Sequence, residues 1–124
     1  MIDYNQLSQE IIQYRRDLHQ IPELGFYVYK TSAYVQNILA GLACEVEQIV
    51  KTGLIAYFDF GREETVAFRA DMDALPIQEE TGLPYASTHE GCMHACGHDG
   101  HMAGLLGFAR VLDDYKRNNV QMPC

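Results

Sequence analysis

The sequence predicts an α/β fold in which helices flank a mixed sheet, and three observations support this prediction. Apolar residues recur at steps of three and four in two N-terminal segments and in one C-terminal segment, as in amphipathic helices. Between these segments lie three short stretches with the composition and length of strands. The final helical segment comes after the strands, where a helix packs back on a sheet.

The first two helices are predicted over residues 4–21 and 32–40. In the first, Asp3 precedes the apolar pattern as an N-cap, and Pro22 and Gly25 end it. Gly41 ends the second helix. The apolar stripes of the two helices consist of Leu7, Ile11, Tyr14, Leu18 and Ile21, and of Val35, Ile38, Leu39 and Leu42. Tyr27, Tyr29 and Tyr34 are expected to serve in packing.

Three strands are predicted next, over residues 44–50, 54–60 and 65–70. Residues 61–64 have the length of a hairpin connection between the second and third strands. The second strand is almost continuously apolar, which is typical of a strand covered on both faces.

A long loop is expected over residues 71–97, where prolines and glycines interrupt any period. A loop of this length inside a compact domain is usually functional. The third helix is predicted from about His98 to Arg117, with its basic end at the negative pole of the helix dipole. The chain then ends where a further strand would start, so we expect it to be the front part of a larger domain.

Length and composition limit the possible classes of protein. The chain has 124 residues, about one domain, and its 48% hydrophobic and 21% charged residues argue against disorder. It has neither an apolar run of the ~20 residues that cross a bilayer nor a signal-peptide pattern at its start. A cytoplasmic location is the expectation.

The charge balance is acidic. Nine Lys and Arg residues against 17 Asp and Glu residues give a formal net charge of −8, which disfavours partners such as nucleic acid or an anionic membrane. An acidic chain suits a cation instead. Four cysteines are too few and too unevenly spaced for a disulfide framework, and two of them lie beside histidines, which raises the question of a metal site.

The densest group of chemically active residues is the segment 93–101, MHACGHDGH. If this segment is extended, His94, Cys96 and His98 project to the same side. If the helix has already begun, His98 and His101 share a face instead. Thiolate and imidazole are ligands that zinc prefers, and Gly97 permits a tight turn between Cys96 and His98, which makes them the better pair.

Further ligands are less clear from the residues alone. Cys92 could be a third ligand, although a spectator thiol is the simpler interpretation. Asp71 and Asp73 follow a predicted strand and could bind a metal or orient a ligating histidine, but Asp also ends strands and starts turns. The pair Glu79–Glu80 lies in a polar loop and is most simply a solvated charge pair.

Three motifs together resemble a known family. The segments RRDLH (15–19) with PELGF (22–26), RADMDALP (69–76) and MHACGHDGH (93–101) occur in the order and spacing seen in the M20 metallopeptidases. The similarity is to their amidohydrolase branch, which includes hippurate hydrolase, indole-acetyl-amino-acid hydrolase and N-acetyl-diaminopimelate deacetylase. It extends from about Tyr14 to Leu112.

This resemblance implies a zinc-exopeptidase-like catalytic domain, normally interrupted by a smaller dimerisation domain in homodimeric enzymes. It implies hydrolysis of the amide bond of a small N-acyl amino acid by water on one or two divalent ions, Zn or Mn. Cys96 and His98 would be metal ligands. Asp71 would be the carboxylate that orients a ligating group, and a glutamate would act as general base.

The sequence departs from the family pattern after the third helix. In the family, the Glu-Glu pair with the general base and further histidine ligands come later than position 124, so Glu79–Glu80 cannot take that role. We therefore expect residues 1–124 to be the N-terminal part of the catalytic domain, without the dimerisation domain and inactive alone. The alternative is a non-catalytic metal-binding or interaction module.

Overall fold

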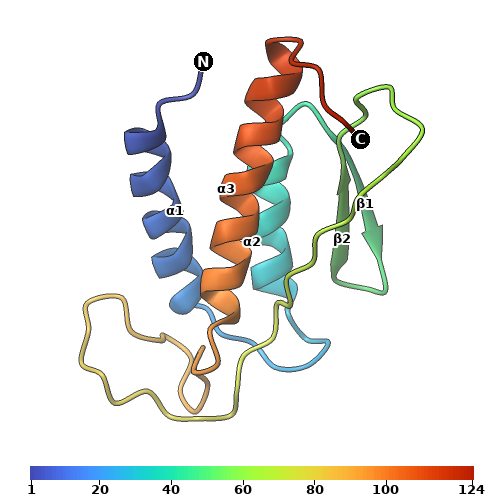
Figure 1. Ribbon diagram of the computed structural model, residues 1–124. Helices are drawn as coiled ribbons and strands as arrows, with labels where there is room; N and C mark the ends of the chain where they lie inside the picture. The colour runs from blue at the N-terminus through green and yellow to red at the C-terminus, as the bar shows by residue number, and fades with distance from the viewer.

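Three helices and one β-hairpin make up the computed structural model, which describes all residues 1–124. In chain order they are α1 (Tyr4–His19), α2 (Tyr29–Leu39), β1 (Glu45–Ile49), β2 (Gly53–Tyr57) and α3 (His98–Arg117). Helix α3 runs antiparallel to α1 and lies between α1 and the hairpin, with α2 behind it (Figure 1). The loop before α3 lies at the end of the helices opposite both chain termini (Figure 1). The predicted mixture of helices and sheet is confirmed.

The hydrophobic core lies where the three helices meet. It consists of six buried side chains from all three helices, and α1 and α3 have the most extensive contact. The two helices approach so closely that a Cβ atom at Gly107 would lie 2.4 Å from Ile11 Cδ1. The core residues are Leu18, Val35, Leu39, Met102, Leu106 and Ala109.

The helix starts follow local capping. Asp3 caps α1 as predicted, because its carboxylate accepts the N–H of Asn5 at 2.9 Å. Helix α2 begins at Tyr29, three residues before the predicted start. The Glu23 carboxylate explains the difference, because it accepts the N–H groups of Lys30 at 3.2 Å and Thr31 at 2.7 Å. These first-turn donors would otherwise have no partner.

The strand prediction was partly wrong. β1 and β2 form a two-stranded antiparallel sheet, so the hairpin joins the first and second predicted strands instead of the second and third. Its turn places Val50 and Lys51 at φ 45° and 67°. The predicted strand 65–70 does not form: it makes no backbone hydrogen bond to another strand, and Val66 and Phe68 stay largely exposed. A strand needs a hydrogen-bonded partner, and residues 65–70 have none, although the second edge of β2 is unpaired.

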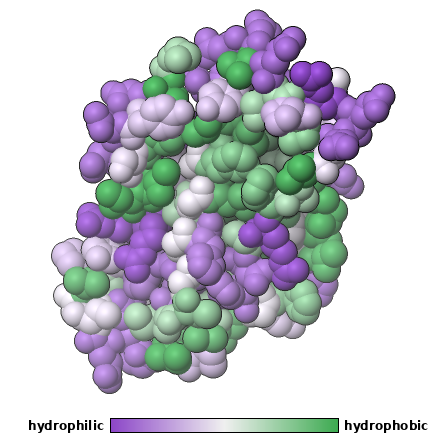
Figure 2. Space-filling view, in the orientation of Figure 1, coloured by the Kyte–Doolittle hydropathy of each residue, from purple (hydrophilic) through white to green (hydrophobic).

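The sheet also has one open face. Leu54 and Ala56 of β2 are partly buried against the core, whereas Ile55 and Tyr57 are exposed, so the strand is not covered on both sides as predicted. Tyr27 and Tyr29 are exposed as well, contrary to the expected packing role. Figure 2 shows hydrophobic residues reaching the surface among polar ones, above all in the upper half of the view. No helix is both long enough and apolar enough to cross a membrane.

Candidate metal centre

The predicted long loop, residues 71–97, brings the motif residues to one end of the helices. It contains no helix and no strand beyond a single bridge between Leu75 and Met93. Backbone hydrogen bonds tie it to the segment around the end of α1: Ala74 N–H donates to Glu23 O at 2.7 Å and Thr88 N–H to Gln20 O at 2.9 Å. These contacts hold an otherwise irregular segment beside the end of α1.

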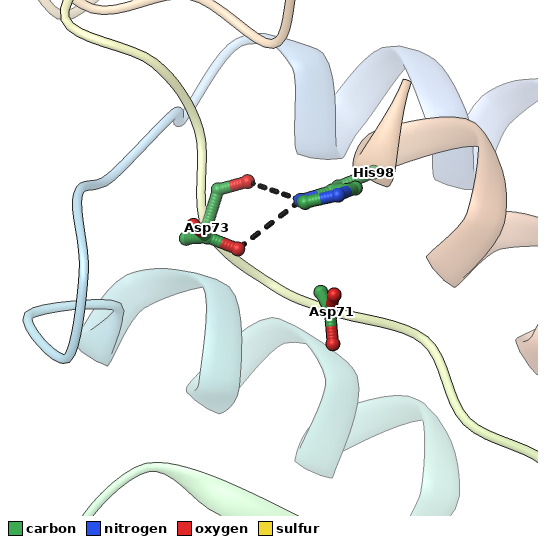
Figure 3. A group of neighbouring side chains, drawn as sticks. All are labelled: Asp71, Asp73 and His98. Carbon is green, nitrogen blue, oxygen red and sulfur yellow. Dashed lines mark hydrogen bonds and ion pairs between the residues drawn. The ribbon is translucent and has the colours of Figure 1, made fainter. Parts of the chain in front are cut away.

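Three potential metal ligands meet where this loop passes α3. One ligand atom from each of Asp71, Asp73 and His98 lies within 4.8 Å of the others. The two carboxylates come from the first residues of the loop, and the imidazole comes from the start of α3 (Figure 3). Sequence reasoning singled out all three residues, but it could not tell which aspartate contacts the histidine.

The tautomer of His98 follows from its contacts with Asp73. The ring Nδ1 lies 2.8 Å from the backbone carbonyl oxygen of Asp73 and 3.1 Å from its Oδ1 (Figure 3). Both oxygens are acceptors, so Nδ1 must carry the proton and the Nε2 lone pair is left for another partner. A histidine that binds a metal ion through one ring nitrogen ordinarily donates a hydrogen bond from the other, as His98 Nδ1 does here.

Asp71 has a different partner. Its Oδ1 accepts a hydrogen bond from Arg69 Nε at 2.9 Å and lies 2.8 Å from Nη2 in the same ion pair, and it makes no hydrogen bond to His98. The Asp71 side chain is half-exposed, with 44% of its surface accessible. The guanidinium fixes one carboxylate oxygen, and the other has no hydrogen-bond partner.

Cys96 lies two residues before His98 and is exposed, outside the three-residue group. Gly97 separates the two with φ at 109°, a backbone conformation that favours glycine, as the predicted tight turn requires. Helix α3 begins at His98, and the rings of His98 and His101 lie 5.9 Å apart on one side of it. The helical alternative for this pair is therefore the observed one. Cys92 is a free, partly buried cysteine.

His94 is the most unusual side chain near the cluster. The residue is 4% exposed, and neither ring nitrogen has a hydrogen-bond partner. Burial lowers its pKa, and the neighbouring His19 and His98 lower it further against the opposing charges of Asp99 and Asp73. Leaving a buried polar group unpaired costs about 1–3 kcal/mol. The ligand atoms of Asp71, Asp73 and His98 are a donor set that fits a divalent metal ion, and the unpaired His94 imidazole lies close enough to His98 and Asp73 to be affected by their charges.

A second polar cluster, which sequence reasoning missed, lies beside the first. His19, at the end of α1, has its Nδ1 2.7 Å from Asp99 Oδ2 and its Nε2 2.9 Å from Glu79 Oε1. The second contact has the distance of an ion pair without the alignment of a hydrogen bond. Arg15 Nε forms an ion pair with the same Asp99 oxygen at 2.9 Å. The side chains of His19, Asp99 and Glu79 are each 2% exposed.

Glu79 is therefore not the solvated residue that the sequence predicted. Burial raises the pKa of its carboxyl group, but hydrogen bonds from the Thr81 hydroxyl and the Ser87 N–H, with the His19 contact, outweigh burial and lower it. Glu80 remains exposed. The only sequence signal was that Arg15 and His19 share a face of α1 at i, i+4, which says nothing about residues from the loop.

Comparisons with known proteins agree with the motif resemblance. Residues 67–124 match the family described as Peptidase family M20/M25/M40. The N-acetyldiaminopimelate deacetylase of Streptococcus pneumoniae is 44% identical over 117 residues, covering 90% of this chain and 31% of that protein. The enzyme of the same name from Halalkalibacterium halodurans is 50% identical over 108 residues, covering 84% of this chain and 29% of that protein.

Solved structures have the same fold. The Bacillus subtilis YXEP protein, described as a dinuclear metal binding peptidase from the M20 family, superposes with a TM-score of 0.83 at 43% identity. The match covers 90% of this chain and 32% of that one. A structure from methicillin-resistant Staphylococcus aureus gives a TM-score of 0.86 at 43% identity, covering 91% of this chain and 30% of that one.

These matches confirm the M20 resemblance and the fold class. The chain is similar to the M20 family over residues 67–124 and to N-acetyldiaminopimelate deacetylases over most of its length. It spans about 30% of the length of the curated relatives it matches.

Proposed function

We propose that this chain contributes part of the metal centre of a metal-dependent amidohydrolase that cleaves N-acyl amino acids. The observation that carries the proposal is the hydrogen bond from His98 Nδ1 to the Asp73 carbonyl oxygen at 2.8 Å, which presents Nε2 as a ligand atom. The similarity to N-acetyldiaminopimelate deacetylases supports an N-acetylated amino acid as the substrate class. We expect a cytoplasmic, homodimeric full-length enzyme.

Cys96 and His98 are the proposed metal ligands, and Asp71 is the proposed catalytic carboxylate. A divalent ion, Zn or Mn, supplies an acidified water and polarises the scissile carbonyl when bound. The Cys96 thiolate and His98 Nε2 would hold the ion, and Asp71, whose Oδ1 is held by Arg69, would orient a ligating group. Asp73 holds the His98 tautomer.

A general base is the part of this chemistry that the 124 residues do not supply. Glu79 is directed at His19, inside the protein, and is engaged by Thr81 and Ser87. Glu80 is exposed in the loop. Neither glutamate occupies the family position of the base, and we therefore propose that residues 1–124 alone bind metal without hydrolysing an amide.

Calorimetric titration of Zn²⁺ and Mn²⁺ into the purified chain tests this proposal. We expect binding that is lost in Cys96→Ser and His98→Gln and kept in Cys92→Ser, the matched control. Incubation of the metal-loaded chain with N-acetyldiaminopimelate should release no acetate. Metal binding unaffected by both ligand substitutions would contradict the proposed centre, and acetate release above the metal-only blank would contradict the proposed inactivity.

A further inference from the structure

The buried cluster around His19 joins three segments that are remote in sequence. His19 belongs to the last turn of α1, Asp99 to the first turn of α3, and Glu79 to the loop. His19 and Asp99 are 80 positions apart in the chain. Their contact is therefore a tertiary one, made next to the proposed metal ligand His98.

The position of Asp99 depends on α1. Its Oδ2 lies 2.9 Å from Arg15 Nε and 2.7 Å from His19 Nδ1, and its side chain is almost completely shielded from water. A buried carboxylate without such partners would be strongly unfavourable. The α1 residues thus determine where the Asp99 side chain lies, and with it the backbone of the first turn of α3.

That turn has little support of its own. Its N-cap is Gly97, which has no side chain to bind the free N–H groups of the helix start. Two contacts hold it instead: His98 to Asp73 on one side and Asp99 to His19 on the other. Because His98 and Asp99 are adjacent, a change in the second contact alters how the His98 ring meets Asp73.

We propose that His19 is a positioning residue for the metal centre, acting through its two ring nitrogens on two different segments. The Nδ1–Asp99 contact orients the turn that carries His98. The Nε2–Glu79 contact holds the loop. The inference rests on the proposed function insofar as His98 binds a metal ion, but its structural core, the control of the His98 tautomer, holds without metal.

Two substitutions separate the arms of His19. In His19→Asn the side-chain amide N–H₂ replaces Nδ1 and keeps a donor toward Asp99, whereas in His19→Gln it replaces Nε2 and keeps a donor toward Glu79. Both variants lose the imidazole ring, so each variant controls for the packing that is lost in the other. A second, isosteric pair, Asp99→Asn and Glu79→Gln, repeats the separation from the other side, with Glu80→Gln as the exposed control.

The first measurement is the tautomer of His98 by two-bond ¹H–¹⁵N correlation of the imidazole in the metal-free full chain. We expect one Nδ1–H tautomer in the wild type, His19→Asn, Glu79→Gln and Glu80→Gln. We expect a mixture of tautomers in His19→Gln and Asp99→Asn. If His19 had a purely structural role, both His19 variants would have a lower melting temperature, and the tautomer of His98 would be the same in both. Unchanged tautomers in both His19→Gln and Asp99→Asn would overturn the proposal. If the His19 variants do not fold, the Asp99→Asn and Glu79→Gln pair decides.

The second measurement is Co²⁺ titration followed by visible absorption. His19→Gln and Asp99→Asn should bind Co²⁺ about 10–100-fold more weakly than wild type, the range for residues that orient a metal ligand, and His19→Asn should restore most of the affinity. Equal Co²⁺ affinity in wild type, His19→Asn and His19→Gln would overturn the positioning role and leave the proposed function intact. A wild type that binds no Co²⁺ would count against the proposed function, while the tautomer measurement still decides the role of His19.

Discussion

The middle and the start of α3 lie in different kinds of surroundings. Along its middle, α3 packs apolar side chains such as Leu106 against α1 and α2, and the contact is non-directional. At its start, Asp99 is buried among His19, Arg15 and the loop, where a hydrogen bond from His19 and an ion pair with Arg15 offset the cost of burying charge. The middle of the helix therefore contributes most of the stability, whereas the start determines how the candidate metal ligands are arranged.

The largest expected effect comes from a substitution in the apolar core that α3 shares with α1 and α2. Leu18 is 0% exposed in the core, so Leu18→Ala should lower the free energy of unfolding by about 2–5 kcal/mol, through lost burial and the cavity left behind. Urea denaturation measures the loss. Leu83→Ala, in the loop and 41% exposed, is the matched control and should cost far less. Similar losses at the two positions would contradict the division of roles.

A medium effect sharpens the comparison within α3 itself. At Gly104 a Cβ atom meets nothing within 4 Å, so Gly104→Ala should stabilise the protein by about 1 kcal/mol through helix propensity. At Gly107 the same atom meets Ile11 Cδ1 at 2.4 Å and Cγ1 at 2.6 Å. Gly107→Ala should therefore gain less or destabilise. Thermal unfolding of both variants tests this, and equal stabilisation would show that α1 and α3 are not in close contact at Gly107.

The smallest expected effect concerns the polar side and is confined to acid pH. Burial opposes the shift, but the contacts with Thr81, Ser87 and His19 hold the pKa of Glu79 below its ordinary value of 4.5. Between the folded and unfolded pKa values the unfolded chain binds more protons, so this stabilisation is complete above about pH 4.5 and is lost as the pH falls through the folded pKa. Glu79→Gln should flatten the acid limb of the unfolding free energy against pH, and Glu80→Gln should leave it unchanged. A slope equal to wild type in Glu79→Gln would contradict the assigned contacts.

The sequence by itself determined the local features of this protein. Apolar periodicity and capping predicted α1 from Asp3 and all of α3 from His98 to Arg117, because both depend on residues within a few turns. The segment 93–101 likewise identified the candidate ligands, since their spacing and residue types carry the chemistry.

Only the tertiary structure decided which remote segments meet. It paired β1 with β2 and left residues 65–70 without a partner, because strand pairing depends on which segments meet in the folded chain. It set the start of α2 at Tyr29, because the Glu23 carboxylate accepts hydrogen bonds from N–H groups of the first turn. It buried the Glu79 side chain against His19 and left the adjacent Glu80 exposed. The two residues are chemically identical, so the difference comes from their positions in the folded chain. Interactions between residues 60–80 positions apart leave no periodic signature in a sequence, so only the folded chain reveals them.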